Sequence, residues 1–380
     1  MEFKFSEQQL MIKNLAKEFA EKEIAKSCVE RDKNAEFPTE IIKKLGELGF
    51  LGMKVSPEYG GIGLDTMCYV LALIEISKVD ASVGVILSVI NSLVNYVLEN
   101  YGSDLIKTKY LNEIASGKKI GAFALSEPEA GSDATKQKTF AKRFGNEWII
   151  NGTKNWITNG TTADYYIVFA QTNLSLKHKG ISAFIIEKGT KGFELGAKED
   201  KMGIRSSDTC SLLFDNCAIP SENLIGVEGD GFKYAMSALN GGRIGIAAQS
   251  IGIAEASFEA ALKYSKTRKA FGTEIMNHQA IQFKIAEMAL EIEAAKLLTY
   301  KAANLKDSGK SFSMESAMAK LKASKTAVNC ALESVQIHGG YGYVREYLVE
   351  RYLRDAKVTE IYEGTSEIQK IIIFRELLKL

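Results

Sequence analysis

Three patterns of apolar and polar residues follow one another along the chain. Residues 1–117 carry apolar residues at helical spacing, as in LMIKNLAKEFAEKEIA, and residues 118–229 contain short β-rich runs, such as DYYIVFAQT, between glycine and asparagine turns. From residue 230 the helical period returns in runs long enough to cross a bundle. The pattern predicts an α+β chain with an N-terminal α-helical domain (1–117), a central small antiparallel β-barrel or sandwich (118–229) and a C-terminal four-helix bundle (230–380).

Two local features refine the N-terminal third. Ser6 and Gln9 form a capping box at the start of the first helix, since they are three residues apart ahead of an apolar run. The most apolar stretch, VGVILSVINSLVNYVL from Val83 to Leu98, is shorter than the roughly 20 residues that a bilayer requires, and it contains two asparagines. It predicts a buried helix.

Charge and cysteine content exclude several classes of function. The 48 Lys and Arg residues nearly balance the 47 Asp and Glu residues, so no strong field would attract nucleic acid or a membrane surface, and neither partner is expected. The five cysteines are scattered and never form a CxxC pair, so neither a disulfide framework nor a metal site is indicated. The first residues, MEFKFSEQQLMIK, lack the apolar run of a secretory signal, so none is expected. We expect a cytoplasmic protein, or a matrix protein if the chain is a processed mitochondrial one.

Five motifs carry a family resemblance. They are QIHGGYGYVREYLVERYLRDAK followed by VTEIYEGTSEIQ, FALSEPEAGSD from Phe123, WITNG from Trp156, TRKAFG from Thr267 and LNGGRIG from Leu239. Together they resemble the acyl-CoA dehydrogenase family, in the family's order and across all three predicted domains. The second motif departs from the usual pattern, because Ser126 stands where the family usually has threonine.

The resemblance implies FAD-dependent dehydrogenation of an acyl-CoA thioester to the trans-2-enoyl-CoA. Glu363 would be the base that removes the Cα proton, with hydride transfer from Cβ to flavin N5, since no side chain accepts a hydride. In the family the backbone N–H of the base residue and a ribityl hydroxyl stabilise the charge that develops on the thioester carbonyl. Without the neighbouring motifs, Glu363 would be interpreted as a solvated acidic turn.

The sequence around Glu363 leaves its pKa open. Ser366 and Gln369 have capping-box spacing, which places Glu363 ahead of a helix whose N-terminal field favours a charged carboxylate. Burial beside an acyl chain would raise the pKa instead. Gly241 and Gly242 exclude a second candidate base, because the isovaleryl-type branch of the family carries its base in that helix.

The resemblance also implies the cofactor contacts. Trp156 and Thr158 occupy alternate positions of one strand and therefore share a face. In the family the positions of Arg268, Phe271, Gln279, Gln336 and the Gly339-Gly340 pair reach the flavin of a neighbouring subunit, which implies a homotetramer, a dimer of dimers with FAD at the subunit interface. The expected cofactor-binding residues are Phe123, Leu125, Ser126, Ser132, Trp156, Ile157, Thr158, Arg268, Phe271, Gln279, Gln336, Gly339, Gly340, Thr365 and Glu367.

The substrate contacts follow from the same resemblance. GGRIGIA resembles short-chain, butyryl-type members, and the bulky VILSV segment from Val85 to Val89 would suit a short acyl group. His338 is expected to be a hydrogen-bonded structural histidine. The expected substrate-binding residues are Ser132, Asn240, Arg243, Tyr362 and Gly364.

The electron acceptor is the last inference from sequence. No GxGxxG follows a strand, so a nicotinamide site is not indicated, and the resemblance implies electron-transfer flavoprotein as acceptor and a place in fatty acid β-oxidation. Two alternatives share the scaffold, an enoyl-CoA reductase running in reverse and an acyl-CoA oxidase. A non-catalytic flavin-binding scaffold is disfavoured by the presence of Glu363.

Overall fold

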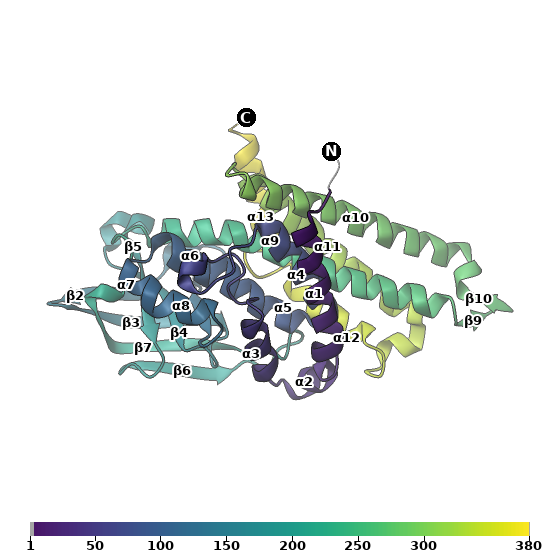
Figure 1. The fold of residues 1–380 in the computed structure, drawn as a ribbon, viewed down its shortest axis with the longest axis horizontal. Coiled ribbons are helices and arrows are strands. Elements are labelled where there is room, and N and C mark those ends of the chain that lie inside the picture. The colour runs from purple at the N-terminus through teal and green to yellow at the C-terminus, as the bar shows by residue number, and fades with distance from the viewer. Residues whose placement is uncertain (1–3, 380) are drawn as a thin grey trace.

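The computed structural model describes residues 4–379, in which helical N-terminal and C-terminal parts flank a single large sheet (Figure 1). The Ser6–Gln9 capping box is confirmed: each side chain bonds the backbone N–H of the other residue. The N-terminal helices are α1 (Glu7–Phe19), α2 (Cys28–Asn34), α3 (Thr39–Glu47), α4 (Thr66–Val79), α5 (Ala81–Ser88), α6 (Asn95–Tyr101), α7 (Asp104–Ile106) and α8 (Asn112–Ala115).

The apolar segment predicted to be a buried helix runs through α5, the π-helical turn η3 (Val89–Val94) and α6. Ala81–Tyr101 is long and apolar enough to cross a membrane by length and composition, but 94% of its most apolar window is buried inside the protein. Asn91 Nδ2 donates to Phe50 O at 2.9 Å, and Asn95 Nδ2 donates to Leu51 O at 2.7 Å. The two asparagines therefore tie this helix to the α3–α4 connection, and the prediction of a buried helix is confirmed.

The central sheet has the strand order β6-β7-β3-β2-β4-β5-β8, with β1 beside β4. The predicted fold class is confirmed, with two differences in the sheet. Among the described residues, the end strands β6 and β8 do not pair with each other, so the sheet is open. In addition, β1 runs parallel to β4. Between β1 and β4 the chain forms the antiparallel β2–β3 pair, and β4 then runs in the same direction as β1. The strands are β1 (Gly121–Ala124), β2 (Phe140–Phe144), β3 (Glu147–Thr158), β4 (Tyr165–Gln171), β5 (Ile181–Glu187), β6 (Phe193–Lys198), β7 (Thr209–Pro220) and β8 (Leu224–Ile225).

The C-terminal helices are α9 (Gly231–Ser265), α10 (Gln279–Asp307), α11 (Ser313–His338), α12 (Val349–Val358) and α13 (Ser366–Leu377). In Figure 1 the sheet lies to the left, and α9, α10 and α11 extend to the right as far as the small hairpin β9 (Lys269–Ala270) and β10 (Thr273–Glu274). α9 packs against α4 and α11 as well as β5, so it connects all three parts of the fold. The domain boundaries at residues 117 and 229 stay predictions.

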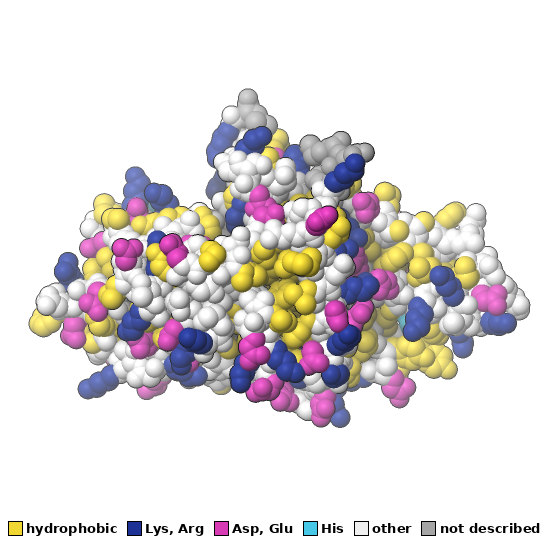
Figure 2. Space-filling view, in the orientation of Figure 1, with side chains coloured by type: hydrophobic (Ala, Val, Ile, Leu, Met, Phe, Trp, Pro, Cys, Tyr) yellow, Lys and Arg dark blue, Asp and Glu magenta, His cyan; other side chains and the backbone are white. Residues whose placement is uncertain are grey.

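The visible surface has no dominant charge. Figure 2 shows basic and acidic side chains interspersed over this face, with apolar side chains gathered between them near the centre. This distribution agrees with the net charge of +1.

One buried ion pair joins α2 to the start of α5. Arg31 Nη2 lies 2.7 Å from Asp80 Oδ2, and the two side chains are only 6% and 4% exposed. Asp80 also caps α5, since its Oδ1 accepts from the Ser82 N–H at 2.9 Å. Removing one partner of a buried pair leaves the other charge without compensation.

We therefore expect Arg31→Met to lower the free energy of unfolding by about 3 kcal/mol, because Asp80 would stay buried and charged. The matched control is Lys26→Met, which removes an ion pair with Glu23 whose lysine is 69% exposed, and it should cost less than about 1 kcal/mol. Urea unfolding of the three proteins measures both values. Equal stability of Arg31→Met and wild type would contradict the role given to the pair.

Candidate active site

The turn between α12 and α13 carries Glu363 in an uncommon backbone conformation. Glu363 and Gly364 both have positive φ, at 48° and 93°. Two buried side chains hold the turn from outside: Lys320 Nζ donates to Gly364 O at 2.8 Å, and Gln369 Nε2 donates to the same oxygen at 2.7 Å. A left-handed non-glycine residue costs about 1 kcal/mol or more, so these bonds stabilise a conformation that the chain does not favour by itself.

The predicted capping box at Ser366 and Gln369 is wrong. The N-cap of α13 is Thr365, whose Oγ1 accepts from the Ile368 N–H at 3.4 Å, and Ser366 is the first helical residue. Gln369 is unavailable because its amide bonds the carbonyls of Glu363 and Gly364. Of the two predicted cofactor contacts here, Thr365 caps the helix and Glu367 is exposed.

The carboxylate of Glu363 is buried although the residue as a whole is half-buried. Both carboxylate oxygens are shielded from solvent and find no hydrogen-bond donor among the described residues. The space they occupy depends on α9: a Cβ at Gly242 would lie 2.0 Å from Glu363 Oε2. Gly242 is therefore glycine because the carboxylate fills the place of a side chain.

Burial has a larger effect on the pKa of this carboxylate than the nearby positive charges have. It raises the pKa of Glu363 to about 7, against the opposing effect of the nearby cations Lys320 and Arg243. Burial likewise lowers the pKa of Lys320 to about 8 and that of Arg243 to about 10. At neutral pH the site thus holds a carboxylate poised between its two protonation states.

Neighbours of Glu363 make polar contacts beside the seam between α9 and α5. Tyr362 Oη donates to Gln249 Oε1, and Arg243 Nη1 donates to Asn240 Oδ1. Among residues 4–379, Arg243 Nε finds no hydrogen-bond acceptor. The structure therefore places four of the five predicted substrate residues, Asn240, Arg243, Tyr362 and Gly364, near Glu363.

Sequence reasoning missed Lys320 and Gln249, and it named Gln369 with the wrong role. A signal for Lys320 existed: it falls at helical spacing within a stripe of small buried residues on α11, where a lysine is out of place. That stripe consists of Ser316, Ala317, Ala319, Ala323, Ser324 and Ala327.

The predicted flavin-binding loop follows β1 and is bonded to β3. Phe123 and Leu125 are buried, Ser126 is half-buried and Ser132 is exposed. The fully buried Lys154 donates to Leu125 O at 3.1 Å and to Glu127 Oε1 at 2.8 Å. This ion pair fixes the FALSEPEAGSD segment to β3, and sequence reasoning did not identify it.

The end of β3 carries the predicted flavin-facing residues. Trp156 has a positive φ of 61° and is 61% exposed, while Ile157 is buried and Thr158 half-buried. The pairing with β7 shifts register between Lys154 and Ile157, so a bulge interrupts the simple strand geometry. Trp156 and Thr158 nevertheless both lie on the more exposed side of the strand.

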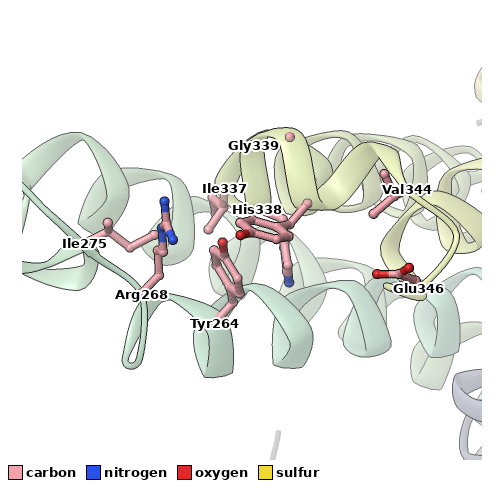
Figure 3. A pocket seen from close by; sticks show the side chains of 10 residues that line it. Tyr264, Arg268, Ile275, Ile337, His338, Gly339, Val344 and Glu346 are labelled. Carbon is pink, nitrogen blue, oxygen red and sulfur yellow. The ribbon is translucent and has the colours of Figure 1, made fainter.

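A cavity of about 530 Å³ lies between the end of α9 and the end of α11 (Figure 3). Its wall contains Arg268, Gly339 and Gly340 from the predicted cofactor set, and the Arg268 guanidinium lies 5.6 Å from the Tyr341 ring centre. None of the described residues that surround Glu363 lines it. The other predicted cofactor residues of the C-terminal part, Phe271, Gln279 and Gln336, are exposed and are not part of this wall.

His338 also lines this cavity, stacked on Tyr264 with ring centres 4.2 Å apart. Its Nδ1 lies 2.7 Å from Ser334 O, as expected for a hydrogen-bonded structural histidine. Burial lowers its pKa, so the ring is neutral at neutral pH.

Comparison with known protein families covers nearly the whole chain. Residues 6–118 match the N-terminal domain of acyl-CoA dehydrogenase, residues 122–217 its middle domain and residues 229–378 its C-terminal domain. The chain belongs to the acyl-CoA dehydrogenase family. The predicted family is therefore confirmed, whereas the roles of individual residues stay predictions.

Similar proteins of the family are found in bacteria and mitochondria. The mitochondrial short-chain specific acyl-CoA dehydrogenase of Rattus norvegicus is 51% identical over 97% of this chain and 90% of its own length. An acyl-CoA dehydrogenase of Bacillus subtilis is 50% identical over 98% of both chains.

Solved structures of similar proteins also match the full length of this chain. The butyryl-CoA dehydrogenase of Megasphaera elsdenii has a TM-score of 0.98 at 46% identity, and both chains are fully covered. A structure described as the electron transferring flavoprotein of Acidaminococcus fermentans contains a chain with a TM-score of 0.99 at 50% identity, again with full coverage of both chains. These matches confirm the fold at high identity.

The role of Gly242 leads to a test with an adjacent control. Gly242→Ala should reduce kcat by about 100-fold or more, because its methyl group would displace the Glu363 carboxylate from its position. Gly241→Ala should retain most activity, since its Cβ would meet only the flexible end of Lys306, at 2.8 Å. Steady-state kinetics with circular dichroism of both variants makes the comparison. Similar activity of the two variants would argue against close packing of Glu363 on α9.

Proposed function

We propose that this chain is an FAD-dependent acyl-CoA dehydrogenase that acts on short-chain thioesters, with Glu363 as the base that removes the Cα proton. The observation that carries the proposal is the buried Glu363 carboxylate, which lies against Gly242 without a hydrogen-bond partner among the described residues. Family membership supplies the reaction, which oxidises a carbon–carbon bond next to the thioester.

The residues present fit a flavin. Trp156 exposes 61% of its surface beside the loop that Lys154 anchors, and such a large aromatic surface fits a planar ring. In the cavity between the ends of α9 and α11, Arg268 offers a guanidinium suited to a pyrophosphate. FAD, when bound, accepts the hydride that leaves Cβ. The proposed contacts are Phe123, Leu125, Ser126, Ser132, Trp156, Ile157, Thr158, Arg268, Phe271, Gln279, Gln336, Gly339, Gly340, Thr365 and Glu367.

The proton step depends on the environment of Glu363. A carboxylate without hydrogen-bond donors keeps its basicity, and its pKa of about 7 matches the operating range of a general base. The backbone N–H of the same residue would stabilise the negative charge that develops on the thioester carbonyl. Arg243, Asn240, Tyr362, Gly364 and Ser132 would bind and orient the rest of the acyl-CoA.

The packing beyond Glu363 supports a short acyl group. A Cβ at Gly245 on α9 would lie 2.4 Å from both Ser88 Oγ and Tyr69 Oη, so α9, α4 and α5 approach closely there. Further along, Gln249 bonds both Ala81 O and the Tyr362 hydroxyl. These contacts close the seam within two helical turns of Gly242. The short-chain and butyryl-CoA specificities of the relatives agree with this geometry.

Two partners complete the proposal. Electron-transfer flavoprotein is the proposed electron acceptor, consistent with the match to a structure described by that name. A homotetramer with FAD at the subunit interface is supported by exposed apolar residues at seven-residue spacing on α10, namely Phe283, Leu290 and Leu297. It would also explain why the Arg268 cavity lies apart from Glu363. Cellular location stays a prediction.

Replacing the base should stop the reaction. We expect Glu363→Gln to lower the rate of flavin reduction by butyryl-CoA by about 10³-fold or more, because the amide accepts no proton at neutral pH. Anaerobic titration followed by flavin absorbance measures the bleaching. The control Glu376→Gln alters a carboxylate that bonds Lys379 at 2.8 Å and should bleach normally. Equal bleaching in Glu363→Gln would rule out this residue as the base.

The pH dependence follows from the same carboxylate. Only the ionised form of Glu363 accepts a proton, and its pKa is raised to about 7. The value of kcat/KM for butyryl-CoA, which reports the free enzyme, should therefore fall about tenfold per pH unit below pH 7 and level off above it. A profile that stays flat down to about pH 5 would mean that the free carboxylate has an ordinary pKa.

Chain length gives an independent test of the substrate. Turnover of C4 acyl-CoA should exceed that of C8, and C16 should be the slowest, because the seam beyond Glu363 is closed at Gly245 and Gln249. Initial rates with the three thioesters at equal concentration measure the order. Fastest turnover on C16 would refute the short-chain assignment.

A further inference from the structure

A fully buried lysine on α11 contacts the Glu363 turn, and the family resemblance assigns it no role. The Lys320 side chain is 0% exposed, and its Nζ donates to Gly364 O at 2.8 Å across 44 positions of sequence. Taking an ammonium out of water costs several kcal/mol, even after relaxation of the protein. A methionine at this position among small residues would avoid that cost. The retained charge therefore points to a function.

The position of the Glu363 carboxylate depends on the backbone that carries it. Its oxygens make no hydrogen bond within residues 4–379, so no side-chain contact of that kind fixes their direction. The backbone there has two successive residues with positive φ. Among the described residues, the Gly364 carbonyl accepts hydrogen bonds from Lys320 and Gln369 only. Lys320 comes from α11 and Gln369 from α13, so the turn is held from two different helices.

We propose that Lys320 is a positioning residue for the base, which holds the Gly364 carbonyl and supplies a buried positive charge that favours the ionised Glu363 carboxylate. This inference rests on the proposed function of Glu363. Gln369 shares the first task and not the second, because its amide is uncharged.

The charges around the pair support this division. Lys320 and Arg243 are the two cations that oppose the effect of burial on Glu363, and Lys320 has the larger effect. With a pKa of about 8, Lys320 is still mostly protonated at pH 7. Arg243 is additionally engaged with Asn240. The titratable groups that face Glu363 or Lys320 are Arg243 on α9, Tyr69 on α4, Tyr362 and Glu360 beside the turn, and Glu367 on α13.

The test compares two variants that remove different parts of the arrangement. Lys320→Met removes the charge and one hydrogen bond, whereas Gln369→Leu removes hydrogen bonds alone. In Lys320→Met the acidic limb of the pH profile of kcat/KM should move about one unit to higher pH, because loss of the cation disfavours the carboxylate. The value of kcat/KM at pH 7 should then fall about fivefold, with little change in KM, because the ionised fraction of Glu363 drops from about one half to about one tenth. In Gln369→Leu kcat should fall without movement of the limb.

A second readout does not depend on electron transfer. Exchange of the Cα hydrogens of butyryl-CoA with D₂O, followed by mass spectrometry, reports proton removal by Glu363 directly. It should slow in Lys320→Met at pH 7 and recover at pH 9. Lys320→Arg keeps the positive charge, so the acidic limb of its pH profile should stay where it is in the wild type. Lys325→Met is the matched control, since Lys325 is exposed on the same helix.

The outcomes separate this proposal from the one on which it rests. If Lys320→Met lowers only the melting temperature and leaves both the limb and the exchange rate unchanged, Lys320 is structural and the inference is overturned. Lys320→Gln provides the same comparison if the methionine variant does not fold. If Glu363→Gln still bleaches the flavin, the proposed function fails instead, whatever Lys320 does.

Discussion

The carboxylate of Glu363 lies in space that α9 leaves empty at Gly242, and much of the surrounding structure serves that close contact. Burying a carboxylate without hydrogen-bond donors is unfavourable, so the fold supplies two cations at its edge, Lys320 and Arg243. They offset the effect of burial only in part. The resulting pKa near 7 is useful to a base and costly to the stability of the folded chain.

The helices around this carboxylate each contribute one necessary element. α9 provides the glycine and Arg243, α11 provides Lys320, and α13 provides Gln369, which bonds the turn carbonyls. α4 and α5 close the seam at Gly245 with Tyr69 and Ser88. Because these contacts come from segments far apart in the chain, Glu363 is placed by the bundle as a whole. The strained turn is stable only within that frame.

The sheet plays a different part. Its buried Lys154–Glu127 pair holds the loop after β1 against β3, which ends in the bulge that exposes Trp156. The cavity around Arg268 lies between the ends of α9 and α11. A single subunit therefore carries two separate groups of predicted cofactor residues. A neighbouring subunit that brings them together, as proposed above, would make one complete site from two chains.

Local patterns in the sequence determined much of this protein. Helical and strand periodicity predicted the three parts of the fold, the buried helix around Val83–Leu98 and the Ser6–Gln9 capping box, because these depend on neighbours within a few residues. The motifs identified the family and pointed to Glu363. Motifs and periodicity depend on short stretches of chain, so they can be recognised from the sequence without a structure.

Only the tertiary structure decided the state of the site. The same spacing that suggested a capping box at Ser366 and Gln369 gave the wrong cap, since Gln369 bonds the turn carbonyls instead. Whether burial or a helix end governs the charge of Glu363 depends on α9 and α11, and Lys320 reaches the turn from 44 positions away. The open sheet and the bulge before Ile157 depend on long-range pairing. Desolvation and long-range contact are properties of packed segments, which the order of residues alone does not reveal.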